Sequence, residues 1–210
     1  MWRNARKVVG IGVLLIFLAI GAIWAGLALR GGTDTTADST SSGQVAIGGP
    51  FTLTNTAGET VTPADFEGRY KFIYFGYTYC PDVCPTALID MSRALNQLAE
   101  TAPDKAKAIT PIFITVDPER DDVAAMKAYI NNFHDRMVGL TGTPDQTAQA
   151  AKSYRVYYEK VKEDRPEGEY LMNHSSYVFL MGPKGDYIDH FTHKTGPDNM
   201  ATKLADLVAG

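Results

Sequence analysis

The hydrophobic positions of residues 48–210 follow two different spacings. Two segments are apolar or aromatic at nearly every position, Tyr70–Tyr79 and Ile109–Val116. Strands that are buried on both faces of a sheet carry such continuous runs. The segment after each run instead repeats apolar residues every three or four positions, which is typical of a helix packed against a sheet. These two helices are expected to begin at Pro85 and at Asp122.

The remaining pattern predicts further strands and two more helices. The strands are expected at Phe51–Thr54, Thr60–Thr62, Met137–Leu140, Val156–Val161, Ser176–Met181 and Asp186–Phe191. The helices are expected from Pro144 and over Pro197–Val208. This order predicts an α/β fold, a thioredoxin-like mixed sheet flanked by helices with an extra N-terminal β-hairpin. The ends of its parallel strands should meet at one edge, where ligands gather in such sheets.

The first 30 residues have a pattern of their own. Val8–Leu29 is a run of 22 residues without a charge, and a helix needs about 20 apolar residues to cross a bilayer. A cleaved signal peptide has a shorter apolar region, about 7–15 residues, that ends in small residues. Because Ala28-Leu29-Arg30 is a poor cleavage context, we expect one uncleaved transmembrane helix.

Basic residues predict the orientation of this helix. Arg3, Arg6 and Lys7 precede the apolar run, and only Arg30 follows it closely. The positive-inside rule then keeps the N-terminus in the cytoplasm and exports the rest of the chain. The sequence therefore predicts a single-pass protein of the bacterial inner membrane with its domain in the periplasm.

The exported part divides into a linker and a folded domain. Residues 31–47 are small and polar and are expected to form a flexible linker. The predicted domains are therefore an anchor over 1–30, this linker, and a thioredoxin-like domain over 48–210. Residues 31–210 hold 24 acidic and 16 basic residues. Such an acidic domain without a basic stripe is a poor candidate for binding nucleic acid.

Two cysteines lie where the first buried strand meets its helix. Cys80 and Cys84 are separated by three residues, and Pro85 follows them. A helix N-terminus carries unpaired N–H groups and partial positive charge, which favour the thiolate that binds soft metals or attacks disulfides. In this interpretation Cys84 caps the helix. The alternative, a structural disulfide, would close so small a loop that it would stabilise the fold little.

One histidine is expected near the cysteines. His174 directly precedes the predicted strand Ser176–Met181, which should run antiparallel to its neighbours. The beginning of that strand then lies at the same sheet edge as the cysteine loop. By its position alone, His174 is more often a surface or core residue than a ligand, so both interpretations stay open at this point.

A charged segment follows the second buried strand at the same edge. Asp117 and Arg120 could hold the cysteine loop or receive a partner. In the structural alternative, Asp121 caps the next helix and Pro118 sets a turn. Asp82, between the two cysteines, joins Asp117 and Arg120 as a candidate to surround the site.

Three separated segments of the sequence resemble the Sco/SenC family. They are YFGYTYCPDVCPTAL, ITVDPERDD and NHSSYVFLMGPKGDYIDHF. The resemblance implies a thioredoxin fold that binds one copper ion, as Cu(I) or Cu(II), through Cys80, Cys84 and His174. It implies delivery to the dinuclear copper centre of cytochrome c oxidase subunit II, with other periplasmic copper carriers as partners. The family residue before the histidine is often acidic, whereas this chain has Asn173.

The donor types favour copper, but two enzymatic functions compete with copper delivery. Sulfur ligands select Cu(I) and imidazole also accepts Cu(II), whereas zinc sites prefer four protein ligands, or three and a water. Cys80 and Cys84 could instead be the redox-active pair of a thiol–disulfide oxidoreductase that keeps the oxidase cysteines reduced. A thiol peroxidase that uses Arg120 is the third hypothesis, and it leaves His174 without a role.

Overall fold

The computed structural model describes residues 46–161 and 169–209. The predicted anchor over residues 1–30 and nearly all of the predicted linker lie outside these described residues. Within the described part, no helix combines the length and the apolarity that crossing a bilayer requires.

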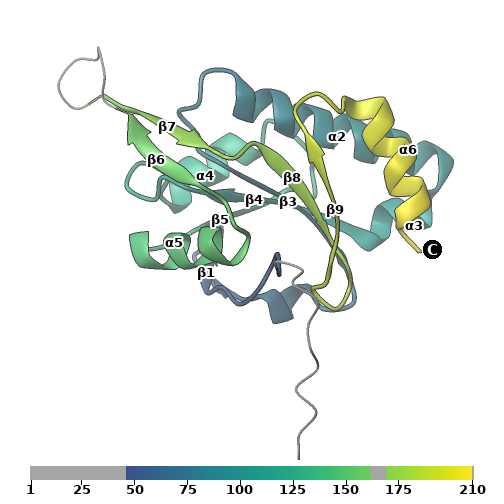
Figure 1. The fold of residues 1–210 in the computed structure, drawn as a ribbon, viewed down its shortest axis with the longest axis horizontal. Helices are drawn as coiled ribbons and strands as arrows, with labels where there is room; N and C mark the ends of the chain where they lie inside the picture. Colours follow the sequence, from purple (N-terminus) through teal and green to yellow (C-terminus); the bar gives the residue numbers. More distant parts are fainter. Residues whose placement is uncertain (1–45, 162–168, 210) are drawn as a thin grey trace, which may run out of the picture. The chain divides into compact units, whose positions relative to one another are not determined.

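A mixed seven-stranded sheet forms the centre of the domain, with strand order β2-β1-β5-β4-β3-β8-β9 (Figure 1). Its strands are β1 (Leu53–Asn55), β2 (Thr60–Val61), β3 (Tyr70–Gly76), β4 (Ile109–Thr115), β5 (Val138–Thr141), β8 (Tyr177–Met181) and β9 (Tyr187–Thr192). β3, β4 and β5 are parallel, while β8 pairs with β3, and β1 with β5, in antiparallel fashion. Every residue of β3 and β4 is buried, as their continuous apolar runs predict.

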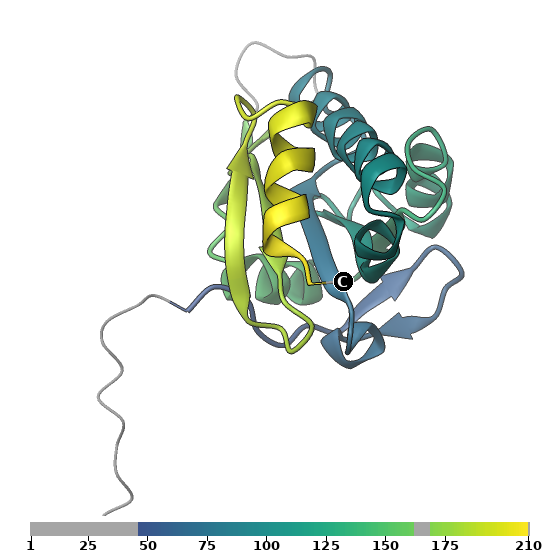
Figure 2. The ribbon, with the colours of Figure 1, turned by 90° about the vertical axis from the view of Figure 1, so that its right-hand side faces the viewer.

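Helices cover both faces of this sheet (Figure 2). They are α2 (Val83–Thr101), α3 (Pro103–Ala108), α4 (Val123–Ile130), α5 (Pro144–Ser153), α6 (Pro197–Leu207) and the short 3-10 helix η1 (Pro63–Phe66). On one face, the Phe113 ring of β4 packs against Tyr129 of α4, with ring centroids 5.5 Å apart. On the other face, Phe75 of β3 packs against Tyr154 at the end of α5 at 5.3 Å. The predicted mixed sheet with its N-terminal hairpin, β1–β2, is therefore confirmed.

The junction between β3 and α2 differs from the prediction. β3 ends at Gly76, three residues before the expected end, and a turn leads to Cys80. α2 begins at Val83 with Asp82 at its N-cap position, so Cys84 lies inside the first turn and does not cap the helix. Pro85 is tolerated there because the first N–H groups of a helix have no acceptor within it.

A second, two-stranded sheet lies beside the first. β6 (Tyr158–Val161) pairs in antiparallel fashion with β7 (Leu171–His174), and Tyr158 lies opposite His174. The sequence predicted β6 but neither β7 nor α3. β7 has only four residues, and its apolar pattern is interrupted by Asn173 and His174, so no period identifies it.

Candidate metal centre

Three donor atoms converge at the edge of the sheet where β3 ends. Cys80 lies in the β3–α2 loop, Cys84 in the first turn of α2, and His174 at the end of β7. Their Sγ and imidazole nitrogen atoms all lie within 4.8 Å of one another. Cys84 Sγ is 3.3 Å from His174 Nε2, and the Cys84 backbone N–H donates to Cys80 Sγ at 3.4 Å. The structure thus brings together the three residues that the sequence singled out.

The His174 ring is held so that Nε2 faces the sulfurs. Its Nδ1 is 3.1 Å from the Ser175 carbonyl oxygen, to which it donates its proton. The neutral tautomer then carries its lone pair on Nε2, the form in which imidazole binds a metal. The rings of Tyr74 and Tyr77 stand edge-on to the imidazole at 6.0 and 5.9 Å. His174 therefore offers a prepared nitrogen ligand.

The two sulfurs have different environments. Cys84 is fully buried, while Cys80 is partly exposed, and neither is in a disulfide. The Cys84 thiol donates to Cys80, and this bond lowers the pKa of Cys80 to about 3, helped by the backbone N–H groups of Asp82 and Cys84 and opposed by burial. The same bond, together with burial, raises the pKa of Cys84. Metal-free protein therefore presents one accessible thiolate in front of one buried thiol.

The floor of the site is formed by β3. Tyr74 is completely buried and its hydroxyl donates to Cys84 Sγ over 3.9 Å. Burial raises the pKa of Tyr74, so its proton stays in place. A Cβ atom on Gly76 would lie 2.8 Å from Cys84 Sγ, so the sulfur occupies the space that any side chain there would need. The sequence analysis identified neither Tyr74 nor Gly76.

The charged segment 117–122, which follows β4, differs from the prediction in the residue that caps the next helix. Asp122, not Asp121, caps α4, and its Oδ1 accepts from Ala125 N at 2.8 Å. Asp121 is buried beneath the cysteine loop and accepts hydrogen bonds from Thr78. Burial raises the pKa of this carboxyl. Sequence reasoning missed this role, because two adjacent aspartates are equally plausible caps until the helix start is known.

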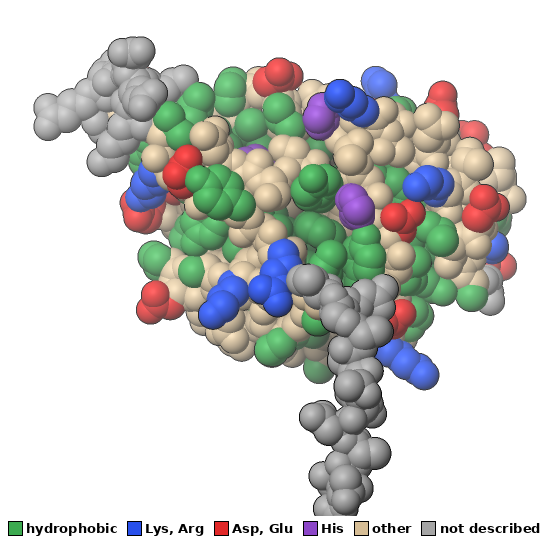
Figure 3. Space-filling model, in the orientation of Figure 1, with side chains coloured by type: hydrophobic (Ala, Val, Ile, Leu, Met, Phe, Trp, Pro, Cys, Tyr) green, Lys and Arg blue, Asp and Glu red, His purple; other side chains and the backbone are tan. Residues whose placement is uncertain are grey.

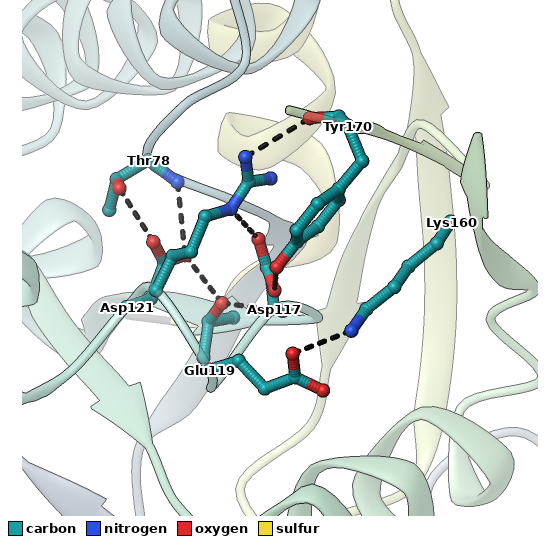
Figure 4. A network of polar contacts seen from close by, with 8 residues as sticks. Thr78, Asp117, Glu119, Asp121, Lys160 and Tyr170 are labelled. Atoms are coloured by element: carbon teal, nitrogen blue, oxygen red, sulfur yellow. Dashed lines mark hydrogen bonds and ion pairs between the residues drawn. The ribbon is translucent and has the colours of Figure 1, made fainter. Parts of the chain in front are cut away.

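The other predicted surrounding residues lie on two sides of the centre. Asp117 is buried and forms an ion pair with Arg120, and both bind Tyr170, which directly precedes β7 (Figure 4). Asp82 is exposed at the start of α2, and its backbone N–H faces Cys80. Asp117 and Arg120 therefore lie mainly against the hairpin of β6 and β7 that carries His174, here named the histidine hairpin.

Exposed apolar side chains lie next to the segments that carry the donor atoms. Of the six large hydrophobic residues exposed in the described part of the chain, three adjoin these segments: Tyr79, Val83 and Tyr157. Tyr79 and Val83 each adjoin a cysteine, and Tyr157 bonds through its carbonyl to Ser175, next to His174. Figure 3 shows hydrophobic side chains at several places on one face of the domain, interspersed with polar and charged ones. Exposed apolar residues beside a binding site are typical of a surface that meets another protein.

The sequence of this chain is similar to those of known proteins over the region that carries the three donor residues. The family model described as SCO1/SenC matches residues 39–209. The protein SCO1 homolog, mitochondrial, of Homo sapiens is 39% identical over 165 residues, which cover 78% of this chain and 53% of the relative. The chain spans about half the length of the first curated relatives that it matches.

Solved structures with the same fold include copper-bound proteins. Bradyrhizobium japonicum ScoI with copper bound is 40% identical, with a TM-score of 0.69 over 78% of this chain and 100% of that one. Arabidopsis thaliana ScoI with copper bound is 36% identical, with a TM-score of 0.70 over 77% of this chain and 97% of that one. Both resemble this chain over nearly the whole domain that carries the Cys–Cys–His cluster.

Proposed function

Since this chain belongs to the SCO1/SenC family, we propose that it binds one copper ion through Cys80, Cys84 and His174 and delivers it during assembly of cytochrome c oxidase. The observation that carries this proposal is the convergence of the three donor atoms within 4.8 Å. The copper-bound relatives support the choice of metal.

The donor set fits copper. Nitrogen and sulfur ligands lie about 2.0–2.3 Å from a transition metal, so three donors around one ion stand roughly 4 Å apart. The three atoms in this chain meet that spacing with small shifts. Two sulfurs favour Cu(I), and the imidazole adds the nitrogen that Cu(II) prefers. One ion, in either oxidation state, is the expected cargo.

The environments of the sulfurs suggest an order of events during loading. Cys80 is accessible and already a thiolate, so it is the first contact for an incoming ion. Binding to Cys84 requires the loss of its proton, because a metal binds the thiolate. His174 Nε2 already faces the sulfurs while Nδ1 is bound to the Ser175 carbonyl. Release reverses these steps while a partner binds at the exposed apolar residues Tyr79, Val83 and Tyr157.

The first test is the metal content of the reduced protein. Loaded with excess Cu(I) and desalted, it should retain one copper per chain, and protein alkylated at both cysteines beforehand should retain almost none. The Cu(II) form should show the intense charge-transfer absorption of a copper–thiolate bond. Retention of zinc in preference to copper when both are offered would contradict the proposal.

The same pair of sulfurs also supports a second candidate function, thiol–disulfide exchange. The Cys80 thiolate would attack a disulfide and form a mixed disulfide, and the Cys84 thiolate would then displace the reduced partner and leave a Cys80–Cys84 disulfide. The accessible thiolate in front of a buried thiol favours this function. A peroxidase has less support, because Arg120 is bound to Asp117 and to the Tyr170 carbonyl.

Two further parts of the proposal concern the proteins that exchange copper with this chain and its location in the cell. We propose the dinuclear copper centre of oxidase subunit II as the acceptor and other periplasmic copper carriers as donors. The family resemblance supports both. We also propose that residues 1–30 anchor the chain in the bacterial inner membrane and that the domain lies in the periplasm, supported by the charge-free run after Arg3, Arg6 and Lys7.

The membrane proposal predicts the result of a fractionation. The full chain should remain with membranes after a carbonate wash, and external protease should digest the domain in spheroplasts while a cytoplasmic marker survives. Replacing Arg3, Arg6 and Lys7 with glutamine should weaken or invert this orientation. A soluble mature protein that begins near residue 30 would contradict the anchor.

A further inference from the structure

The metal ligands lie on segments from two different sheets. The cysteine loop follows β3 of the seven-stranded sheet, and His174 ends β7 of the two-stranded sheet. A two-stranded hairpin is at best marginally stable on its own. β8 follows His174 and pairs with β3, and contacts outside the two sheets add to this pairing in holding the imidazole relative to the sulfurs. The loop between β4 and α4 supplies such contacts on both sides of the centre (Figure 4).

Asp121 connects this loop to the cysteine side. Its carboxylate is completely buried. Oδ2 accepts from the Thr78 backbone N–H at 3.0 Å, and Oδ1 accepts from the Thr78 hydroxyl at 2.6 Å. Thr78 lies in the turn after β3, two residues before Cys80. Two bonds to one residue fix both its backbone and its side chain, so Asp121 holds the entry to the cysteine loop.

Asp117 and Arg120 connect the same loop to the histidine side. Asp117 Oδ1 accepts from the Tyr170 hydroxyl at 2.7 Å, and Asp117 Oδ2 pairs with Arg120 Nε. Arg120 Nη1 donates to the Tyr170 carbonyl at 3.0 Å, and its guanidinium carbon lies 3.6 Å from the centroid of the Tyr170 ring. Tyr170 leads directly into β7 and is four residues before His174. These contacts therefore set the position of the histidine hairpin.

The two sides are joined within the loop. The buried Thr115 hydroxyl donates to Asp121 at 2.6 Å and accepts from the Asp117 backbone N–H at 2.9 Å. The Arg120 guanidinium also lies 4.8 Å from the ring centroid of Tyr79, next to Cys80. One continuous network thus runs from the cysteine loop to the histidine hairpin.

We propose that residues 115–121, here named the bracket, position the thiolates and the imidazole separately. Asp121 sets the cysteine loop, and the Asp117–Arg120 pair sets the histidine hairpin. All three are positioning residues, because none of them contacts a donor atom. The purpose of the bracket rests on the proposed copper function, since the oxidation states of copper use sulfur and nitrogen ligands to different extents.

Hydrogen exchange of the metal-free protein tests the cysteine side of the bracket without copper. Asp121→Ala should raise amide exchange at residues 77–80 roughly tenfold or more, because local opening governs exchange, and change residues 171–174 little. Thr78→Val, which removes one bond, should act in the same way but more weakly and serves if Asp121→Ala fails to fold. Asp121→Asn should restore protection, because its amide still accepts from the Thr78 N–H and can donate to the hydroxyl.

The histidine side should give the opposite pattern. Arg120→Leu, and more weakly Tyr170→Phe, should raise exchange at residues 171–174. Tyr170→Phe should leave residues 77–80 nearly unchanged, whereas Arg120→Leu also removes the guanidinium from the Tyr79 ring and should raise exchange at residues 77–80 by a smaller factor than at residues 171–174. Thr147→Val is the matched control, since it removes a buried hydroxyl that bonds only within α5 and its cap. It should leave both segments protected.

Copper then supplies the functional readout. Arg120→Leu should weaken Cu(II) binding roughly tenfold to a hundredfold, the usual effect of losing an outer partner of a ligand, while Cu(I) binding changes much less. Asp121→Ala should weaken both. If both variants loosen both segments equally, or neither segment, the bracket is wrong. If instead exchange follows the predicted pattern but wild-type protein binds no copper, only the proposed function fails.

Discussion

Alanine in place of Cys80 or of Cys84 is expected to lower the affinity for Cu(I) roughly a hundredfold to a thousandfold. Structural metal sites with four ligands are worth about 10–16 kcal/mol, or about 2.5–4 kcal/mol for each ligand, and each 1.4 kcal/mol is about tenfold in affinity. Loss of one of the two sulfurs also removes half of the soft thiolate ligands that favour Cu(I) over other metal ions. Competition with a chromophoric Cu(I) chelator measures the effect.

His174→Ala is expected to weaken Cu(II) binding more than Cu(I) binding, the converse of the cysteine variants. It should lower Cu(II) affinity by a comparable factor and remove the Cu(II)–thiolate spectrum of the wild type, while Cu(I), held by both sulfurs, loses less. His193→Ala is the matched control, because His193 is exposed and outside the donor cluster. An unchanged Cu(II) spectrum and affinity in His174→Ala would remove His174 from the ligand set.

The elements that are recognised from the order of neighbouring residues could be predicted from the sequence. The runs that became β3 and β4 are apolar or aromatic at nearly every position because both faces of each strand are covered. The cysteine spacing at the strand-to-helix junction is likewise local, so half of the site could be identified directly. Two boundaries at this junction were wrong: β3 ends at Gly76 and not at Tyr79, and α2 begins at Val83 and not at Pro85. Proline does not fix the start of a helix, because it is equally acceptable at several positions of a first turn.

The position of His174 was predicted for an incomplete reason. Its closeness to the cysteines was inferred from the antiparallel strand after it, yet the residue itself belongs to β7. β7 exists because it pairs with β6, with Tyr158 opposite His174. Pairing between short strands depends on contacts far along the chain. A four-residue segment with two polar positions is too short to show the alternating apolar pattern that identifies a strand.

Asp117 and Arg120 were predicted to surround the site, but most of the contacts that support it could not be predicted from the sequence. Asp121 is stable as a buried carboxylate only because Thr78 and Thr115, from the ends of two strands, both donate to it. The absence of a side chain at Gly76 matters only because Cys84 Sγ fills that space. Both facts arise from tertiary packing, and neither residue type is unusual at its place in the sequence.

The proposed copper delivery and the alternative disulfide reduction would use the same sulfurs, and replacement of His174 distinguishes between them. The Cys80 thiolate is stabilised first by the Cys84 thiol, so a His174→Ala protein should keep a reducible cysteine pair. Its nitrogen ligand is lost, however, and with it the Cu(II) state. The variant therefore removes metal handling and leaves thiol chemistry largely in place, whereas Cys84→Ala removes both.

In cells, His174→Ala is accordingly expected to lower cytochrome c oxidase activity nearly as far as Cys84→Ala at ordinary copper levels, with partial recovery when copper is added. Purified His174→Ala protein should still reduce a model disulfide at close to the wild-type rate, and copper-loaded wild type should not, because the metal occupies both sulfurs. His193→Ala should behave as wild type in every assay. Normal oxidase assembly by His174→Ala without added copper would reject delivery as the main task, and the accessible Cys80 thiolate would then act chiefly as a reductant.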